Sequence, residues 1–396
     1  MSHLFANYNR LPVSFEHGEG CALTSTEGKT YLDFLSGIAV CSLGHSHPKL
    51  VAALQDQAAK LLHVSNLYGI PEQEEAASLL AQHCGQGILN KAFFCNSGAE
   101  ANECLIKLAR KYAHSNNLPP VITVAHNSFH GRTMATVSAT GTPKYHEGFA
   151  PLVPGFQFVE FNDLEAALGA LETSCAVLVE PIQGEGGVIP ANPDYLKGLE
   201  QACKAQNKLL LLDEVQTGIG RTGHWLAAHH YGITPHAVSL AKGLGGGVPV
   251  GAVLAQESLA VLLTPGTHAT TFGGNPLASR AVSTVLQTIE EENLLTQAEK
   301  SGAYLRGRLG GLPGVKAVRG VGLMVAAVTE RAAGEIAQEC FEQGLLVNAV
   351  RPNVIRLAPP LVVTPGEIDQ AVSILAPICG AGLASTEERK DLCRSL

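Results

Sequence analysis

Residues 209–223, LLLLDEVQTGIGRTG, indicate the fold class, because four consecutive leucines run directly into two acids. A continuous apolar run of this kind is typical of a strand buried on both faces of a parallel sheet. Similar runs alternate with amphipathic helical patterns along the chain. Strands are expected at 121–125, 175–180, 237–241 and 251–255, and helices at 97–116, 161–172 and 194–208. The pattern therefore predicts an α/β fold with a mainly parallel central sheet covered by helices.

The chain has 396 residues, which is too long for one compact core, so two domains are expected. The large domain is expected to span 46–290. A smaller α+β domain is expected to be discontinuous, formed by 1–45 and 291–396. One long helical pattern covers 275–309, and the charged residues 385–396 are expected to form a loosely held tail.

Composition excludes several classes of protein. Lys and Arg total 27 against 35 Asp and Glu, a net charge of −8, so nucleic acid and anionic membranes are not expected partners. No run of 18 apolar residues predicts a membrane span, and the N-terminus lacks a signal-peptide pattern. Ten cysteines without a C-x-x-C motif are typical of reduced core thiols. We expect a cytoplasmic protein.

Lys242 lies in the segment HAVSLAKGLGGG, residues 236–247, between an apolar strand and a run of glycines. A lysine ammonium is costly to bury unless it is paired. Burial lowers the lysine pKa and so increases the fraction of neutral amine, which is the nucleophilic form. The glycines are expected to leave room for a bound molecule and for movement of the lysine. The pattern favours a reactive lysine.

Asp213 ends the leucine strand, where ligands of parallel sheets collect. A plain strand-end acid is the alternative interpretation. Gly218, Gly220 and Gly223 also spell the dinucleotide motif G-x-G-x-x-G. That motif should join a strand directly to a helix, whereas five residues intervene here and no helical pattern follows. A nicotinamide-dependent oxidoreductase is therefore only a remote alternative.

Ser97, Gly98, Ala99 and Glu100 stand at the start of an expected helix. The S-x-x-E spacing is that of a capping box. A helix N-terminus with small residues also presents free backbone N–H groups and a positive dipole end, which suit a phosphate. Both interpretations are compatible.

Phe129 and Arg132 flank His130 in the segment FHGR. An aromatic ring and an arginine can stack on a flat cofactor and clamp a carboxylate, although a core Phe and a surface Arg are equally common. We interpret His130, like His45 and His47, as structural, because no spacing of His, Cys and acids resembles a metal site.

Three further segments carry candidate site residues. Glu180 and Glu185 lie in a glycine-rich turn after a strand, and Thr270 and Thr271 precede a helix start. Arg356 lies on an apolar strand, where an unpaired guanidinium is costly, so a carboxylate partner is expected. Together with the reactive lysine, the strand-end acid, the aromatic ring and the helix N-terminus, these residues fit a site for pyridoxal phosphate (PLP).

The sequence resembles one family along nearly its whole length. The segments are FFCNSGAEANE, SFHGRT, CAVLVEPIQGEGG, LLLLDEVQTGIGRTG, AKGLGGGVPVGA and TFGGNPLA. In this order they resemble the signatures of class III (ornithine-type) aminotransferases, which implies the fold type I PLP-dependent transferase architecture. FLSGIAVCSLGH and NSFHGRT are most similar to the members that act on N-acetylornithine.

The resemblance implies the cofactor PLP and assigns the residues around it. Lys242 would form the Schiff base and carry the proton, Asp213 would pair with the ring nitrogen, and Gln216 would approach the ring hydroxyl. The remaining assignments are Phe129 and Val215 for the two ring faces, and Ser97, Gly98, Ala99 and Thr271 for the phosphate. Thr271 would come from a second subunit, because the family is a homodimer with the site at the subunit interface.

The resemblance also implies substrates. Arg132 would bind the α-carboxylate of N-acetylornithine, and the acceptor 2-oxoglutarate and its product glutamate would need both Arg132 and Arg356. Glu185 would shield Arg356 when the donor binds, while Thr270 and Tyr8 are weaker candidates for substrate contacts. The implied role is in arginine biosynthesis.

Other activities share these residues. The identity of the amino donor stays open, because the acyl group is recognised by pocket shape. The alternatives are succinylornithine, succinyldiaminopimelate, ornithine and 4-aminobutyrate. An aminomutase would also share Lys242 and Asp213, whereas a non-catalytic relative would be expected to lack one of them.

Overall fold

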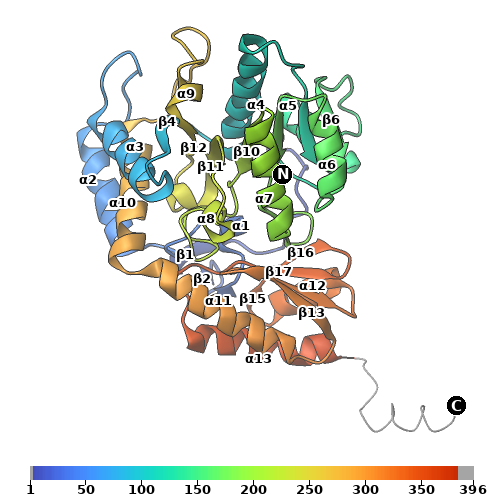
Figure 1. The fold of residues 1–396 in the computed structure, drawn as a ribbon. Coiled ribbons are helices and arrows are strands. Elements are labelled where there is room, and N and C mark those ends of the chain that lie inside the picture. Colours follow the sequence, from blue (N-terminus) through green and yellow to red (C-terminus); the bar gives the residue numbers. More distant parts are fainter. Residues whose placement is uncertain (1–2, 382–396) are drawn as a thin grey trace, which may run out of the picture.

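The central sheet has seven strands, and β12 is antiparallel to both of its neighbours, β4 and β11 (Figure 1). The structure is a computed structural model that describes residues 3–381. In sheet order the strands are β4 (Leu89–Cys95), β12 (Gly251–Gln256), β11 (Ala237–Leu240), β10 (Leu209–Asp213), β7 (Ala176–Val179), β5 (Ile122–Ala125) and β6 (Phe156–Val159). The remaining adjacent pairs are parallel, which confirms the expected mainly parallel sheet.

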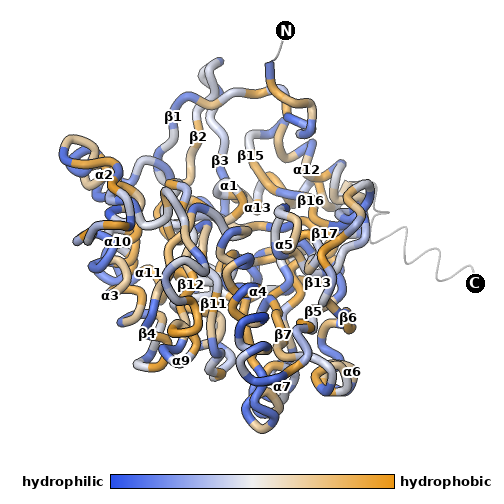
Figure 2. Tube along the Cα trace, turned by 90° about the horizontal axis from the view of Figure 1, so that it is seen from above, coloured by the Kyte–Doolittle hydropathy of each residue, from blue (hydrophilic) through white to orange (hydrophobic). Residues whose placement is uncertain are grey.

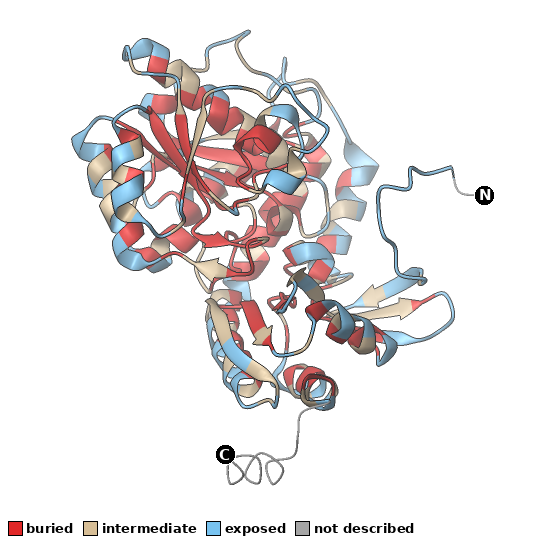
Figure 3. Ribbon diagram, turned by 90° about the vertical axis from the view of Figure 1, so that its right-hand side faces the viewer, coloured by how far each residue is buried: buried red, intermediate tan, exposed pale blue. Residues whose placement is uncertain are grey.

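The leucine run explains how this sheet is buried. Leu210 and Leu212 pack into one apolar cluster, while Leu209 and Leu211 pack into another, because successive strand residues point to opposite faces. Figure 3 shows this buried interior in red. One cluster includes α3 (Pro71–Cys84), α6 (Leu164–Leu171), α7 (Pro193–Ala205), α8 (Ala227–Tyr231) and α10 (Pro276–Glu291), and the other includes α4 (Gly98–Ser115), α5 (Met134–Ala139) and α9 (Glu257–Ala260). Helices therefore cover both faces.

A second sheet is formed by residues that follow the central sheet in the chain. It has the order β13 (Val315–Val321), β14 (Met324–Thr329), β17 (Val354–Leu357) and β16 (Asn348–Arg351), and all its adjacent pairs are antiparallel. The other helices of this part are α11 (Leu294–Gly310), α12 (Ala333–Glu342) and α13 (Pro365–Gly380). The single long helix expected over 275–309 is wrong: α10 ends at Glu291, and Asn293 takes a left-handed φ of 52° before α11 begins.

The N-terminal strands β1 (Phe15–Glu19), β2 (Ala22–Ser25) and β3 (Thr30–Asp33) form an antiparallel meander. β15 (Leu345–Leu346) pairs in parallel with β3, so the N-terminal strands share one sheet with a strand from the C-terminal part of the chain (Figure 2). The elements that remain are α1 (Ser36–Ala39), α2 (Pro48–Lys60), the 3-10 helices η1 (Pro143–Tyr145) and η2 (Lys242–Gly245), and a two-stranded ribbon of β8 (Ile182–Gln183) and β9 (Ile189–Pro190). The tail expected at 385–396 lies outside the described residues.

The helices of residues 3–381 include none with the length and apolar character that a membrane span needs. This observation agrees with the absence of long apolar runs in the sequence.

Candidate active site

A cavity of about 440 Å³ opens where β7, β10 and β11 end. Most of the candidate residues meet there, although they come from segments far apart in the chain. Those that line the cavity are Ser97, Gly98, Ala99, Phe129, Arg132, Glu180, Glu185, Asp213, Val215, Gln216 and Lys242. The carboxyl edge of the sheet thus gathers a lysine, an aromatic ring, carboxylates and a helix N-terminus in one place.

Lys242 lies two residues beyond β11 and has a left-handed φ of 47°. Such a φ is uncommon outside glycine and is found at strained functional positions. Burial, followed by the nearby Arg356 guanidinium, lowers the pKa of Lys242. The side chain is therefore easier to deprotonate than a lysine in water.

The glycines after Lys242 serve two purposes, so the expectation that all of them leave room is only partly right. A Cβ on Gly243 would lie 2.4 Å from Ser42 Oγ, and one on Gly245 would lie 2.7 Å from Val250 Cγ1. These two positions need glycine for close packing. Gly247 lines the cavity and has open space around it.

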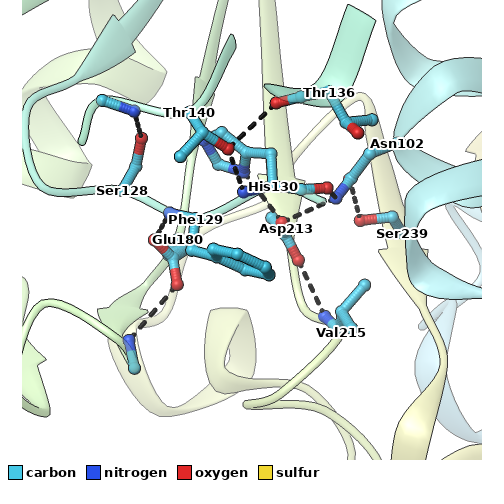
Figure 4. A network of polar contacts seen from close by, with 12 residues as sticks. Asn102, Ser128, Phe129, His130, Thr136, Thr140, Glu180, Asp213, Val215 and Ser239 are labelled. Carbon is cyan, nitrogen blue, oxygen red and sulfur yellow. Dashed lines mark hydrogen bonds and ion pairs between the residues drawn. The ribbon is translucent and has the colours of Figure 1, made fainter. Parts of the chain in front are cut away.

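Asp213 is buried in a polar network at the floor of the cavity (Figure 4). Its Oδ2 accepts hydrogen bonds from Asn102 Nδ2 at 2.7 Å and pairs with His130 Nδ1 at 2.8 Å, and its Oδ1 accepts one from the Val215 N–H at 3.0 Å. Asn102 Oδ1 in turn accepts a hydrogen bond from Ser239 Oγ at 2.6 Å. The carboxylate is therefore fixed from three directions.

Sequence reasoning overlooked part of this network. Asn102 and Ser239 are not among the site residues that the sequence predicts, and the interpretation of His130 as structural names no partner for it. Burial opposes protonation of His130, but the hydrogen bond and charge of Asp213 outweigh it and raise the His130 pKa. Asn102 did carry a signal: it is a polar residue on the apolar face of α4, one turn after Gly98.

Glu180 follows β7 and connects two parts of the cavity wall. Its carboxylate accepts hydrogen bonds from the Phe129 N–H at 3.1 Å and from the Gly184 N–H at 3.2 Å. Burial raises the pKa of Glu180 to about 7. The side chain thereby links the aromatic residue to the turn that carries Glu185.

The start of α4 is capped, but not as the full capping box predicted from the sequence. Ser97 Oγ accepts a hydrogen bond from the Glu100 N–H at 3.2 Å. The Glu100 carboxylate bonds to the N–H of Asn96 rather than to that of Ser97. Gly98 packs directly on Val215. A Cβ at Gly98 would lie only 2.7 Å from Val215 Cγ1, so a larger residue would not fit there without a shift. The first turn of α4 therefore faces the cavity with small residues and backbone N–H groups.

Arg356 has the carboxylate partner that its position on an apolar strand required. Its Nη1 donates to Glu185 Oε1 at 2.6 Å and to Gln216 Oε1 at 3.1 Å, and its Nη2 donates to Asn348 Oδ1 at 3.1 Å. Burial opposes ionisation of Glu185, but the charge of Arg356 outweighs it and lowers the Glu185 pKa. Arg132 differs, because it is exposed, lies 4.1 Å from the Tyr145 ring centroid and forms no ion pair within residues 3–381.

Three candidates lie away from the cavity. Tyr8 is 70% exposed, and Thr270 and Thr271 line a neighbouring cavity of about 350 Å³. Asn96 lines both cavities, and its Nδ2 donates to Thr270 Oγ1 at 3.4 Å. The two threonines are therefore adjacent to the main cavity without reaching into it.

The G-x-G-x-x-G segment does not form a dinucleotide site. Its three glycines pack against Leu240, Leu361 and Glu299, and none of them lines the cavity. Across the described part of the chain, no group of three or more His, Cys, Asp or Glu side chains is placed to hold a metal ion.

The donor set fits PLP. The cavity offers a lysine amine, a fixed carboxylate, an aromatic ring with Val215 nearby, and the first turn of an 18-residue helix. These groups match the aldehyde, the ring nitrogen, the ring faces and the phosphate of that molecule.

Comparisons with known proteins agree on one family. The family model for class-III aminotransferases matches residues 5–379. An acetylornithine aminotransferase of Gloeobacter violaceus is 51% identical over 382 residues, which cover 94% of each chain. One from Aquifex aeolicus is 48% identical and covers 96% of this chain and 100% of its own.

Solved structures agree with these relatives. The acetylornithine aminotransferase of Elizabethkingia anophelis superposes with a TM-score of 0.84 at 36% identity, and covers 95% of this chain and 96% of its own. The ornithine aminotransferase of Toxoplasma gondii, described with partial occupancy of PLP at its active site, gives 0.90 at 35% identity over 98% of this chain and 94% of its own.

Proposed function

The chain belongs to the class III aminotransferases, whose cofactor is PLP, and on that premise we propose that it transfers the terminal amino group of N-acetylornithine to 2-oxoglutarate. The products are N-acetylglutamate semialdehyde and glutamate, in the service of arginine biosynthesis. Relatives of about half-identical sequence over nearly the whole chain support this choice among the donors that the sequence leaves open.

PLP, when bound, supplies an aldehyde carbon for attachment of the amine and an electron-withdrawing ring that stabilises negative charge at the reacting carbon. Lys242 and Asp213 would hold it at the aldehyde and the ring nitrogen, with Gln216 near the ring hydroxyl. Phe129 and Val215 would contact the two faces of the ring. Ser97, Gly98 and Ala99 would bind the phosphate.

Lys242 is also the proposed base. Its lowered pKa increases the fraction of free amine near neutral pH, as removal of a proton from the donor's amine-bearing carbon requires. The same amine, once protonated, would deliver the proton to the carbon on the other side of the transferred nitrogen, and its burial would limit exchange of that proton with water.

The state of the two arginines supports a donor whose single carboxylate is remote from the reacting amine, and the relatives support N-acetylornithine among such donors. Arg356 forms an ion pair with Glu185 at 2.6 Å, whereas Arg132 forms no ion pair within the described residues and is exposed. In this state the site offers one carboxylate clamp, which suits N-acetylornithine, since its single carboxylate is remote from its reacting amine. Glutamate and 2-oxoglutarate carry two carboxylates and would require Glu185 to leave Arg356.

The proposed assembly is a homodimer in which Thr271 of one chain reaches the phosphate bound by the other. Leu67, Tyr68 and Phe272 are exposed by 86%, 67% and 60%, an unusual amount of large apolar surface. Asn66 Nδ2 donates to the Gly273 carbonyl at 3.0 Å and so joins the two loops that carry them. A second copy would cover this surface and place Thr270 and Thr271 at the interface. The cytoplasm remains the predicted compartment.

An absorption spectrum of the PLP-loaded protein tests the proposal. Addition of N-acetylornithine should bleach the long-wavelength band, and 2-oxoglutarate should restore it. Bleaching only with succinylated donors, ornithine or 4-aminobutyrate would move the substrate assignment. A protein without such a band after incubation with PLP would refute the role of Lys242.

A further inference from the structure

Glu185 lies at the tip of a small hairpin. β8 and β9 pair antiparallel, with Gln183 opposite Ile189, and residues 184–188 connect them. We call residues 184–188 the Glu185 turn. The N–H groups of Gly187 and Val188 both donate to the Gly184 carbonyl at 3.2 Å. The backbone is therefore closed on itself, and Glu185 is the only charged side chain of the turn.

Val188 anchors the turn to the second sheet. It is fully buried with Met324, Ala326 and Val354, which belong to β14 and β17. Its φ is 52°, a left-handed value that β-branched residues very rarely adopt. Such a conformation persists only where the surrounding structure determines it, often at binding sites.

Two arginines of the second sheet hold the same turn. Arg319 Nε on β13 donates to the Gly187 carbonyl at 2.8 Å, and Arg351 Nε on β16 donates to the Gly186 carbonyl at 3.2 Å. Neither arginine forms a carboxylate ion pair within the described ranges, and Arg351 Nη2 also donates to Asn127 Oδ1 at 3.1 Å. On the opposite side, Glu180 accepts from the Gly184 N–H.

The glycines of the turn permit this close enclosure. A Cβ on Gly187 would lie 2.9 Å from Arg319 Nη2, and one on Gly184 would lie 2.5 Å from Gln216 Oε1. The backbone of the turn thus has little freedom to shift, whereas the Glu185 side chain can rotate.

We infer that Arg319 and Arg351 are specificity-determining positioning residues, which fix the Glu185 turn so that Glu185 is held over Arg356. The inference rests on the proposed function, in which a donor with one carboxylate reacts while Arg356 is covered. A fixed turn lowers the entropy cost of the Glu185–Arg356 pair. Loosening it should disfavour the covered state, and thereby penalise N-acetylornithine more than glutamate.

The test compares the two amino donors in single-turnover reactions of the PLP-loaded enzyme. The variants are Arg319→Met and Arg351→Met, with Arg351→Lys as the conservative change and Glu185→Gln as the reference. Arg308→Met is the matched control, because Arg308 pairs with Asp369 on α13 and is remote from the turn. The quantity measured is the ratio of kcat/KM for N-acetylornithine to that for glutamate.

We expect each Met variant to lower this ratio about fivefold, the effect of losing the one hydrogen bond that each arginine makes to the turn. Arg351→Lys should recover part of the ratio, and Arg308→Met should leave it unchanged. Combining Arg351→Met with Glu185→Gln should give no further fall beyond Glu185→Gln alone, because one residue acts through the other.

The outcomes separate the inference from its premise. If Glu185→Gln lowers the ratio while both Met variants match the wild type, the positioning role is refuted and the proposed function stands. Equal losses with both donors would show a general structural effect and also overturn it. If N-acetylornithine does not react with the wild type, or Glu185→Gln leaves the ratio unmoved, the premise fails and the inference falls with it.

Discussion

Replacing Asn102 by alanine should weaken the site more than its distance from any substrate suggests. Asn102 is buried and donates to Asp213 Oδ2 at 2.7 Å and to the His130 carbonyl at 2.8 Å, while its Oδ1 accepts from Ser239. A hydrogen bond to a charged group contributes about 1.5–3 kcal/mol and a neutral one about 1 kcal/mol. The three bonds together predict a loss of roughly 4 kcal/mol, divided between the stability of the fold and the binding of PLP.

Two measurements divide that loss. Thermal unfolding of the PLP-free protein reports the part that acts on folding. A titration of cofactor absorbance or fluorescence reports the part that acts on binding. Asp213 keeps its bonds to His130 and Val215 in this variant. We therefore expect about half of the loss, roughly 2 kcal/mol, to fall on the binding of PLP, which is about a 30-fold weaker affinity.

Ser239→Ala is the matched control for this prediction. It removes only the outer bond to Asn102 Oδ1 and leaves every contact of Asp213 in place. Its effect on PLP affinity should stay within about threefold, given a neutral hydrogen bond of about 1 kcal/mol whose loss is only partly transmitted. If Asn102→Ala binds PLP as tightly as Ser239→Ala does, the argument that Asn102 positions Asp213 is wrong.

Four other predictions follow from the same geometry. Lys242→Ala should keep the fold, measured by circular dichroism, and abolish turnover with either substrate; retained turnover would contradict the assignment. Burial raises the pKa of Glu214 to about 7, so between pH 4.5 and 7 the folded state retains a proton that the unfolded state loses. The contribution of Glu214 to stability should therefore fall by roughly 3 kcal/mol over that window, and Glu214→Gln should remove that part of the fall in denaturant titrations at each pH. Arg132→Lys should raise KM for N-acetylornithine about tenfold through loss of bidentate binding, and an unchanged KM would exclude Arg132 as the clamp. The double variant Leu67→Glu and Phe272→Glu should sediment as a monomer with weakened PLP binding, whereas an unchanged sedimentation coefficient would exclude that surface as the interface.

The parts of the fold that follow from local pattern were predictable. The leucine run requires burial on both faces, and its two alternating sets of side chains do enter separate apolar clusters. Asp213 and Lys242 were predicted at one edge because parallel strands end together. Asn293 shows the limit of local pattern: the apolar periodicity runs through it, and only the left-handed backbone there divides α10 from α11.

The contacts between distant segments were not predictable in the same way. The polar network draws Asn102, His130, Asp213 and Ser239 from a helix, a loop and two strands. No periodicity couples these positions, so each one taken alone is most simply explained as a helix residue, a core histidine or a strand residue. The hairpin that carries Glu185 has strands of only two residues, too short for a recognisable alternation.

The need of buried charges for polar partners explains why these unpredicted contacts are concentrated at the cavity. Apolar side chains can pack together in many arrangements. A leucine strand therefore predicts that its faces are buried, but not which side chains they contact. A buried carboxylate or guanidinium is tolerated only with particular donors at particular distances. Asp213 and Arg356 are both nearly fully buried, and each has at least two polar side chains within hydrogen-bonding distance. Residues that look unremarkable in sequence, such as Asn102 and Asn348, are therefore fixed by charges elsewhere in the chain. In a chain of this family, a polar residue on an otherwise apolar helix face or strand is accordingly best examined as a partner of a buried charge.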